Sequence, residues 1–273
     1  MHIRDIRPCG WIKIKSNTYT IDDDNVINLN WKNIHPYLVK SEDKEVECDD
    51  IAPFRILTWD IECQSSRGFP EFPDANIDGD FISQIGIGFK IFNKDIKFKA
   101  VFSCLKSDEP EEGILINCQD EKSMLINFMN TIKELGIDII SGYNTWGFDD
   151  KYLIIRLEKH NLGYMLSSVS RVKDWDAQLK NQSFNSGACG FNEYNIFVIP
   201  GVETFDMIQA IRREYKLDSY KLAFVGKHFK VDKGKEDMPY KRLFEILDKG
   251  NESPQEMLEV CGYCMQDAYL VLD

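Results

Sequence analysis

The sequence predicts an α/β protein in which helices flank a mixed β-sheet, with a smaller β-rich segment before it. Two observations support this fold class. From residue 54, three strand-like apolar segments follow one another through short connections, which is typical of antiparallel strands. Helical periodicity and further short strands then alternate, which is typical of helices layered on parallel strands. An acidic stretch precedes residue 53, so we expect domains at 1–52 and 53–273.

Composition and charge exclude several classes of protein. Hydrophobic residues make up 43% of the 273 residues, yet no apolar run approaches the roughly 20 residues of a membrane span, and no signal-peptide core follows Met1. We therefore expect no membrane partner. The eight scattered cysteines favour a reducing, intracellular compartment over a disulfide scaffold. The net charge of −12 argues against a module that grips duplex nucleic acid by itself, but not against an enzyme whose acids hold metal.

The N-terminal segment is expected to form short strands. Residues 10–15 alternate like a strand and could pair with residues 18–21, and a turn follows at 22–25. The acidic residues 41–50 are predicted to be a solvated linker.

The first three strands of the sheet follow the linker. Pro53 opens a strand at 54–60, and the Gly, Pro, Asp and Ser content of residues 64–80 predicts a loop. Two further strands, at 81–92 and 96–104, are joined by a tight hairpin turn.

Helices and parallel strands complete the prediction. Asp120 is expected to cap a helix that Gly136 ends, before a strand at 137–140. A second helix begins at Asp149 or Asp150, and a hairpin with a Gly-rich tip is expected at 182–199. The remaining elements are a strand at 202–205, a helix that Asp206 begins, a short helix from Ser219 to Lys227, a mobile basic tract at 227–235, and a last helix with Ser253 as cap and Pro254 in its first turn.

Asp60 and Glu62 are the first candidate site residues. They lie two residues apart in the strand, so both side chains point to the same face. Neighbouring carboxylates repel each other unless a cation holds them, which suggests a divalent-metal site with oxygen ligands. An exposed strand end with two solvated acids is the alternative.

Two later segments add acids and a tyrosine. Asp149 lies where a strand has ended and a helix begins, the place where ligands collect in open α/β sheets, although it could simply cap its helix. Tyr263 and Asp267 are four residues apart on the last helix and share one face, although plain packing would explain them too. Asn144 and Phe148 flank Asp149.

Together these residues form a recognisable series of three motifs. Their order resembles the proofreading 3′–5′ exonuclease domain of family B DNA polymerases, of the DEDDy group and the ribonuclease H-like fold. The motifs are Phe54-Arg-Ile-Leu-Thr-Trp-Asp60-Ile-Glu62-Cys63, Gly142-Tyr-Asn144-x-x-x-Phe148-Asp149-x-x-Tyr152-Leu153 and Tyr263-Cys-x-x-Asp267-Ala-x-Leu270. The stretches 5–12, 213–222, 227–229 and 235–237 are similar to the replicative eukaryotic and large-DNA-virus branch.

The resemblance implies a reaction and roles for the residues. The reaction is hydrolysis of the 3′-terminal phosphodiester of single-stranded DNA with two Mg²⁺ or Mn²⁺ ions about 4 Å apart. Asp60 would bridge both ions, Glu62 and Asp267 would complete the first ion, and Asp149 would hold the second. Tyr263 would orient the attacking water. Asn144 would contact the terminal nucleotides and Phe148 would stack near the last bases, while the 182–199 hairpin would help to separate the primer strand.

The partners and location also follow from the resemblance. No Asp-Thr-Asp or Ser-Leu-Tyr-Pro segment of a polymerase palm is present, so we expect a fragment of a larger polymerase. Its partners would be the single-stranded 3′ end of a DNA primer and the palm, fingers and thumb domains of the full-length chain, in a nucleus or at a viral replication site.

Two other functions remain open. One is a free-standing exonuclease acting on short DNA or RNA, and the other is a non-catalytic scaffold of a replication complex. Cys261 and Cys264 form a Cys-x-x-Cys pair, but no second pair or His pair completes a structural zinc site, so the sequence predicts none.

Overall fold

The computed structural model describes residues 10–21, 27–41, 44–186, 190–231 and 238–273. The chain divides into two compact units, Met1–Ala52 and Pro53–Asp273. Several sequence predictions lie outside the described residues: the turn at 22–25, the tip of the hairpin at 187–189, most of the similarity at 5–12, and residues 232–237, which include the end of the basic tract.

The N-terminal unit consists of short antiparallel pairs. β1 (Ile12–Ile14) pairs with β4 (Ile34–Pro36), and β2 (Tyr19–Ile21) pairs with β3 (Ile27–Leu29), so the predicted pairing of the first two strands is wrong. A 3₁₀ turn at Trp31–Asn33 precedes β4. The prediction of a solvated linker at residues 41–50 is wrong in part, because β5 (Leu38–Ser41) pairs with β6 (Lys44–Glu47). Val39 lies directly opposite Val46, and this apolar pair favours a hairpin despite the surrounding charges.

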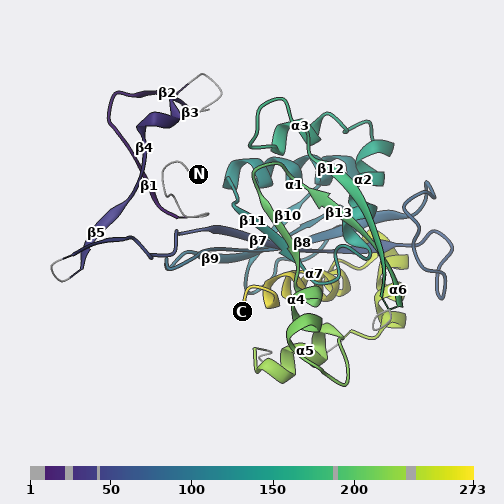
Figure 1. The fold of residues 1–273 in the computed structure, drawn as a ribbon. Coiled ribbons are helices and arrows are strands. Elements are labelled where there is room, and N and C mark those ends of the chain that lie inside the picture. The colour runs from purple at the N-terminus through teal and green to yellow at the C-terminus, as the bar shows by residue number, and fades with distance from the viewer. Residues whose placement is uncertain (1–9, 22–26, 42–43, 187–189, 232–237) are drawn as a thin grey trace. The chain divides into compact units, whose positions relative to one another are not determined.

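As predicted, a mixed sheet forms the centre of the second unit (Figure 1); it has six strands, one more than the sequence predicts. Its spatial order is β10–β9–β8–β7–β11–β14. The pairs β7/β8 and β8/β9 are antiparallel, whereas β9/β10, β7/β11 and β11/β14 are parallel. The strands are β7 (Arg55–Gln64), β8 (Phe81–Ile91), β9 (Lys97–Ser103), β10 (Ile114–Asn117), β11 (Ile139–Gly142) and β14 (Glu203–Asp206).

β7 is longer than the sequence predicts. Its pairing with β8 continues to Gln64 opposite Phe81, with a register shift between Glu62 and Cys63. The two acids therefore lie inside the strand, not at its end. Cross-strand pairing with the long β8 extends β7 into residues that read as loop when the chain is considered alone.

Helices cover both faces of the sheet (Figure 1). α1 (Glu121–Leu135) and α2 (Asp149–Lys159) pack on one face, and α7 (Pro254–Leu270) lies on the other. On β7, Trp59 points to the first face, where its ring lies 5.4 Å from that of Phe128. Thr58 points to the second face, where its hydroxyl donates to the Ala268 carbonyl at 2.6 Å. The alternation of β7 thus separates the main hydrophobic core from the α7 face.

Two glycines of β8 let α7 approach the sheet closely. A Cβ atom at Gly86 would lie 2.3 Å from the Cys264 carbonyl oxygen, and one at Gly88 would lie 3.0 Å from the Tyr269 Cα. Side chains at these positions would push the helix away from the strand. The Gly-Ile-Gly segment therefore sets the distance between α7 and the central strands.

The predicted helix ends are mostly confirmed. Asp120 and Ser123 form a capping box at the start of α1, and Gly136 ends it in the left-handed conformation, with φ 56°. Asp206 caps α4 (Met207–Glu214), and α7 begins at Pro254 after Ser253. Ser219 does not cap a helix: α5 runs over Leu222–Phe229 after Lys221, so the first residues of the basic tract are helical.

Some elements were not predicted or were shifted. The strand expected at 137–140 begins two residues later. The hairpin is present as β12 (Gln178–Ser186) and β13 (Gly190–Val198). The sequence prediction lacks β10, α3 (Met165–Val169) and α6 (Tyr240–Lys249). Among the described residues, no helix is long and apolar enough to cross a lipid bilayer.

Candidate active site

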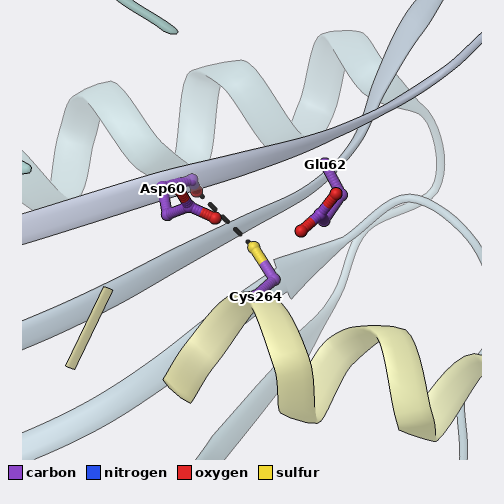
Figure 2. A group of neighbouring side chains, drawn as sticks. All are labelled: Asp60, Glu62 and Cys264. Carbon is purple, nitrogen blue, oxygen red and sulfur yellow. Dashed lines mark hydrogen bonds between the residues drawn. The ribbon is translucent and has the colours of Figure 1, made fainter. Parts of the chain in front are cut away.

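Among the described residues, Asp60, Glu62 and Cys264 form a tight group of possible metal ligands (Figure 2). One ligand atom from each side chain lies within 4.8 Å of the others. The two acids project from β7 toward α7, as their spacing predicts, and Cys264 reaches them from the helix. Its thiol donates to the Asp60 carbonyl oxygen at 3.5 Å. Burial, reinforced by the charges of Asp60 and Glu62, raises the pKa of the Cys264 thiol.

Asp149 reaches the same strand from its open edge. β11 pairs with β7 only as far as Ser141 opposite Thr58, so beyond Thr58 no strand of the described part of the chain pairs with β7 on that side. Asp149 is the first residue of α2, and its carboxylate accepts a hydrogen bond from the Ile61 amide at 3.2 Å. The sequence alternative, a helix cap, does not hold, because the capping position is Phe148. Asp149 instead satisfies a backbone donor between the two acids of β7.

The electrostatics of this corner favour a cation. Asp149 is 5% exposed, and burial, reinforced by the charge of Asp60, raises its pKa well above the ordinary value. Glu62 is 8% exposed. Crowded carboxylates in a desolvated site are each costly in the charged form, and a divalent ion offsets that cost. The donor set is therefore suited to a hard cation such as Mg²⁺ or Mn²⁺.

Asn144 and Phe148 lie in the loop between β11 and α2. Asn144 has a φ of 66°, and its backbone N–H donates a hydrogen bond to the Asp206 carboxylate at 2.8 Å. A second bond, from the Trp146 amide, holds the loop to the same carboxylate at 3.2 Å. Asp206 thus caps α4, as predicted, and also fixes this loop, which the sequence did not indicate.

Phe148 is accessible next to a groove. It is 37% exposed, and its ring lies 5.3 Å from that of Tyr152. With Arg67 and Lys151 it lines a cavity of about 650 Å³ between α2 and the loop that follows β7. The lining also contains the acids Glu71 and Asp74, and Arg67 is paired with Asp80 at 3.1 Å.

Asp267 and Tyr263 lie on α7, near Cys264 in the sequence. Asp267 is buried, one turn beyond Cys264, and none of its oxygens belongs to the tight group of ligands described above. Tyr263 is partly exposed and lines a groove of about 1170 Å³ alongside α7, over β9 and β10. The structure thus brings Asp149 of α2 to the Ile61 backbone between Asp60 and Glu62, although Asp149, like Asp267, is not part of the tight group of ligands. The third motif lies on α7, the helix that packs against β7 and β8.

A buried ion-pair network anchors the loop after β7. The Glu121 carboxylate accepts two hydrogen bonds from Arg156, at 2.9 and 2.6 Å, and one from the Ile82 amide at 2.8 Å. Arg156 also donates to the carbonyls of Ala75 and Ile77 at 3.3 Å. Both ionic side chains are less than 10% exposed, so this network holds the loop against α1 and α2.

Sequence reasoning missed two contributors to the site. Cys264 stands inside the third motif, but only its Cys-x-x-Cys spacing was considered, and that spacing carries no information about Asp60. Tyr240 of α6 stacks on Phe72 with ring centres 4.9 Å apart. Burial, reinforced by the charge of Glu62, raises the pKa of Tyr240 to about 12.

Asp150 has a different role from its neighbour. Its carboxylate accepts a hydrogen bond from the Phe197 amide at 2.7 Å, which ties β13 to α2. Burial raises the pKa of Asp150 to about 8.

Comparison with known proteins identifies the family. The profile of the exonuclease domain of DNA polymerase family B matches residues 1–225. DNA polymerase delta catalytic subunits of Glycine max and Arabidopsis thaliana are each 32% identical, over 96% and 97% of this chain. A DNA polymerase of Paramecium bursaria Chlorella virus NY2A is 26% identical over 99%. The chain spans only 23%, 24% and 29% of these relatives' lengths. With the acidic pair and the mixed sheet of the structure, these matches show that the chain belongs to the exonuclease domain family of the family B DNA polymerases.

Proposed function

We propose that this chain removes nucleotides from the 3′ end of single-stranded DNA and releases nucleoside monophosphates, as the proofreading exonuclease of a DNA-directed DNA polymerase. The main observation that supports this proposal is the placement of Asp60 and Glu62 on one face of β7, with the Asp149 carboxylate hydrogen-bonded to the Ile61 backbone amide between them. Exonuclease domains of this family use divalent metals, and the carboxylates of this corner suit such ions.

In this proposal, four acids hold two metal ions. Asp60 lies next to Glu62 and also acts electrostatically on Asp149, so it is the side chain best placed to be shared between two ions. Glu62 and Asp267 would complete one ion, and Asp149 would hold the other. When bound, two Mg²⁺ or Mn²⁺ ions supply the positive charge that stabilises the attacking and leaving oxygens.

Asn144 and Phe148 would hold the end of the DNA strand. Both are exposed on the loop that leads into Asp149, so a strand lying against them ends near the acids. Stacking of a base on an aromatic ring contributes about 1–3 kcal/mol per base. Because a mismatched end costs less to unpair, binding of single strands also favours mismatched primers.

Tyr263 would orient the attacking water through its hydroxyl. Its position on α7 is set by the packing of that helix on β8, and the residue is partly exposed. Replacement of Tyr263 by Phe should slow the reaction and leave metal affinity largely intact. An equal loss of metal affinity would contradict this role.

The partners and location follow from the relatives. Polymerase delta catalytic subunits and a viral DNA polymerase contain the matching segment, so the domain would act on DNA together with palm, fingers and thumb domains, in a nucleus or at a viral replication site.

The decisive experiment incubates the chain with single-stranded DNA labelled at its 5′ end, in the presence of Mg²⁺. We expect stepwise shortening from the 3′ end that disappears in the Asp60→Ala, Glu62→Ala double variant. Asp150→Asn is the matched control, because it changes a buried acid that binds the Phe197 amide. Activity that survives the double variant would refute the proposal. Calorimetry with Mn²⁺ separates it from a scaffold role, since a scaffold has no need to hold two ions.

A further inference from the structure

We propose that Cys264 supplies a sulfur ligand that lets the Asp60–Glu62 pair bind a thiophilic divalent cation, such as Zn²⁺ or Cd²⁺, in competition with Mg²⁺. The inference rests on the proposed metal-binding role of the two acids. It adds a ligand from α7, and it predicts a metal selectivity that carboxylates alone would not have.

The geometry that carries the inference is the convergence of three side chains from two elements (Figure 2). The Cys264 sulfur and one oxygen from each acid lie within 4.8 Å of one another. Zinc bonds to sulfur at about 2.3 Å and to carboxylate oxygen at about 2.0–2.2 Å. To bind one ion together with the sulfur, the two carboxylates have to rotate toward Cys264, since the three atoms lie up to 4.8 Å apart. Asp60 is partly exposed, so an ion can enter from its side.

The position of the sulfur is fixed by the packing of the helix. Cys264 is 0% exposed, and the Gly86 backbone lies directly beneath it on β8. The thiol already points at β7, where it donates to the Asp60 carbonyl. A sulfur held in this way costs little further conformational entropy when it binds metal, so the site is pre-organised.

The mixed set of oxygen and sulfur ligands determines which metal ions bind more tightly. Mg²⁺ prefers six oxygen ligands at about 2.0–2.1 Å and gains little from sulfur. Zn²⁺ and Cd²⁺ accept thiolate together with carboxylate, and a water can take the remaining position of a tetrahedral site. When the metal–sulfur bond forms, the S–H bond breaks and its proton leaves to solvent, while both carboxylates bind as anions.

The second cysteine of the Cys-x-x-Cys pair provides an internal control. Cys261 is also 0% exposed on α7, but it packs in a hydrophobic cluster with Val101, Ile246 and Met257, and the group around Asp60 does not include it. A metal held by the two cysteines would thus differ from the proposed site, which uses one sulfur and two carboxylates.

The test is titration of the whole chain with Cd²⁺, monitored by the ultraviolet charge-transfer absorption of cadmium–sulfur bonds. We expect native protein and Cys261→Ser to gain the same absorption from the first equivalent, and Cys264→Ser to lose it. Cd²⁺ affinity should fall by at least about tenfold in Cys264→Ser, with a much smaller change in Mn²⁺ affinity. An Asp60→Asn, Glu62→Gln variant, which keeps the sulfur, should also lose the high-affinity absorption.

Three outcomes would overturn the inference. The absorption could persist in Cys264→Ser, it could persist in the variant without the acids, or Cd²⁺ and Mn²⁺ affinities could fall equally in Cys264→Ser. The acid variant keeps the test decisive if the serine variant does not fold. Failure of the proposed nuclease would look different, because native protein would then bind no Mn²⁺ and shorten no DNA.

Discussion

At Gly86, the addition of a single methyl group should lower the rate of the reaction strongly and the stability of the fold only slightly. A Cβ there would lie 2.3 Å from the Cys264 carbonyl oxygen and 2.6 Å from its carbonyl carbon. Both atoms belong to the backbone of α7, so no side-chain rotation relieves the clash. The helix must move by about 1 Å to restore an ordinary contact distance. The move would carry Cys264 and Asp267 away from β7.

The expected magnitudes differ for the two properties. Overpacking costs about 1–3 kcal/mol, and replacing a strand glycine by alanine returns about 0.5–1 kcal/mol of backbone entropy. The free energy of unfolding should therefore fall by only about 1–2 kcal/mol, which leaves a domain of ordinary stability folded. A displacement of about 1 Å in a catalytic arrangement costs on the order of a hundredfold in rate. Gly86→Ala should thus be folded and about a hundred times slower.

The assay pairs urea unfolding with shortening of single-stranded DNA in Mg²⁺. Gly262→Ala is the matched control, because a Cβ at this α7 position has no atom within 4 Å. Alanine in a helix interior is favoured over glycine by about 1 kcal/mol, so this variant should be more stable and equally active. The reasoning is refuted if Gly86→Ala retains native activity, since the close approach of α7 would then not position the site.

Three further predictions concern stability. Arg156→Met should lower the free energy of unfolding by about 3 kcal/mol, because it removes the buried ion pair of Glu121 and leaves that carboxylate with only His160 and the Ile82 amide. The more exposed Arg242→Met is the control and should leave the free energy of unfolding almost unchanged in the same urea experiment. Asp150 has a folded-state pKa of about 8, above its unfolded value, so its contribution to stability is present at low pH and is lost as pH rises between about 4 and 8. Asp150→Asn should therefore make the free energy of unfolding less dependent on pH in this range, by at most about 1.4 kcal/mol per pH unit. A pH dependence equal to that of the native chain would contradict this prediction. Asp120→Ala should lower the thermal unfolding midpoint through the loss of about 0.5–2 kcal/mol, since it removes the cap of α1.

Elements with strong local signals were predicted well. The capping residues of α1, the apolar repeat along it and its terminal glycine are all local, so the sequence located both ends of that helix. The end of β7 was not predictable in the same way, because its last residues are strand only through pairing with β8. At Ser219 the local signal was misleading. Serine often caps helices, but α5 begins three residues later, after Lys221.

The sequence by itself determined the α/β class, the shared face of Asp60 and Glu62 and the set of acids, because strand alternation and motif spacing are properties of the local chain. Only the tertiary structure decided how those acids meet. The short β11 leaves the Ile61 amide open for Asp149, and the two glycines of β8 bring α7 near enough for Cys264 to join the pair. Such contacts join residues about 90 and 200 positions apart, and their distances depend on packing between elements, which no local pattern encodes.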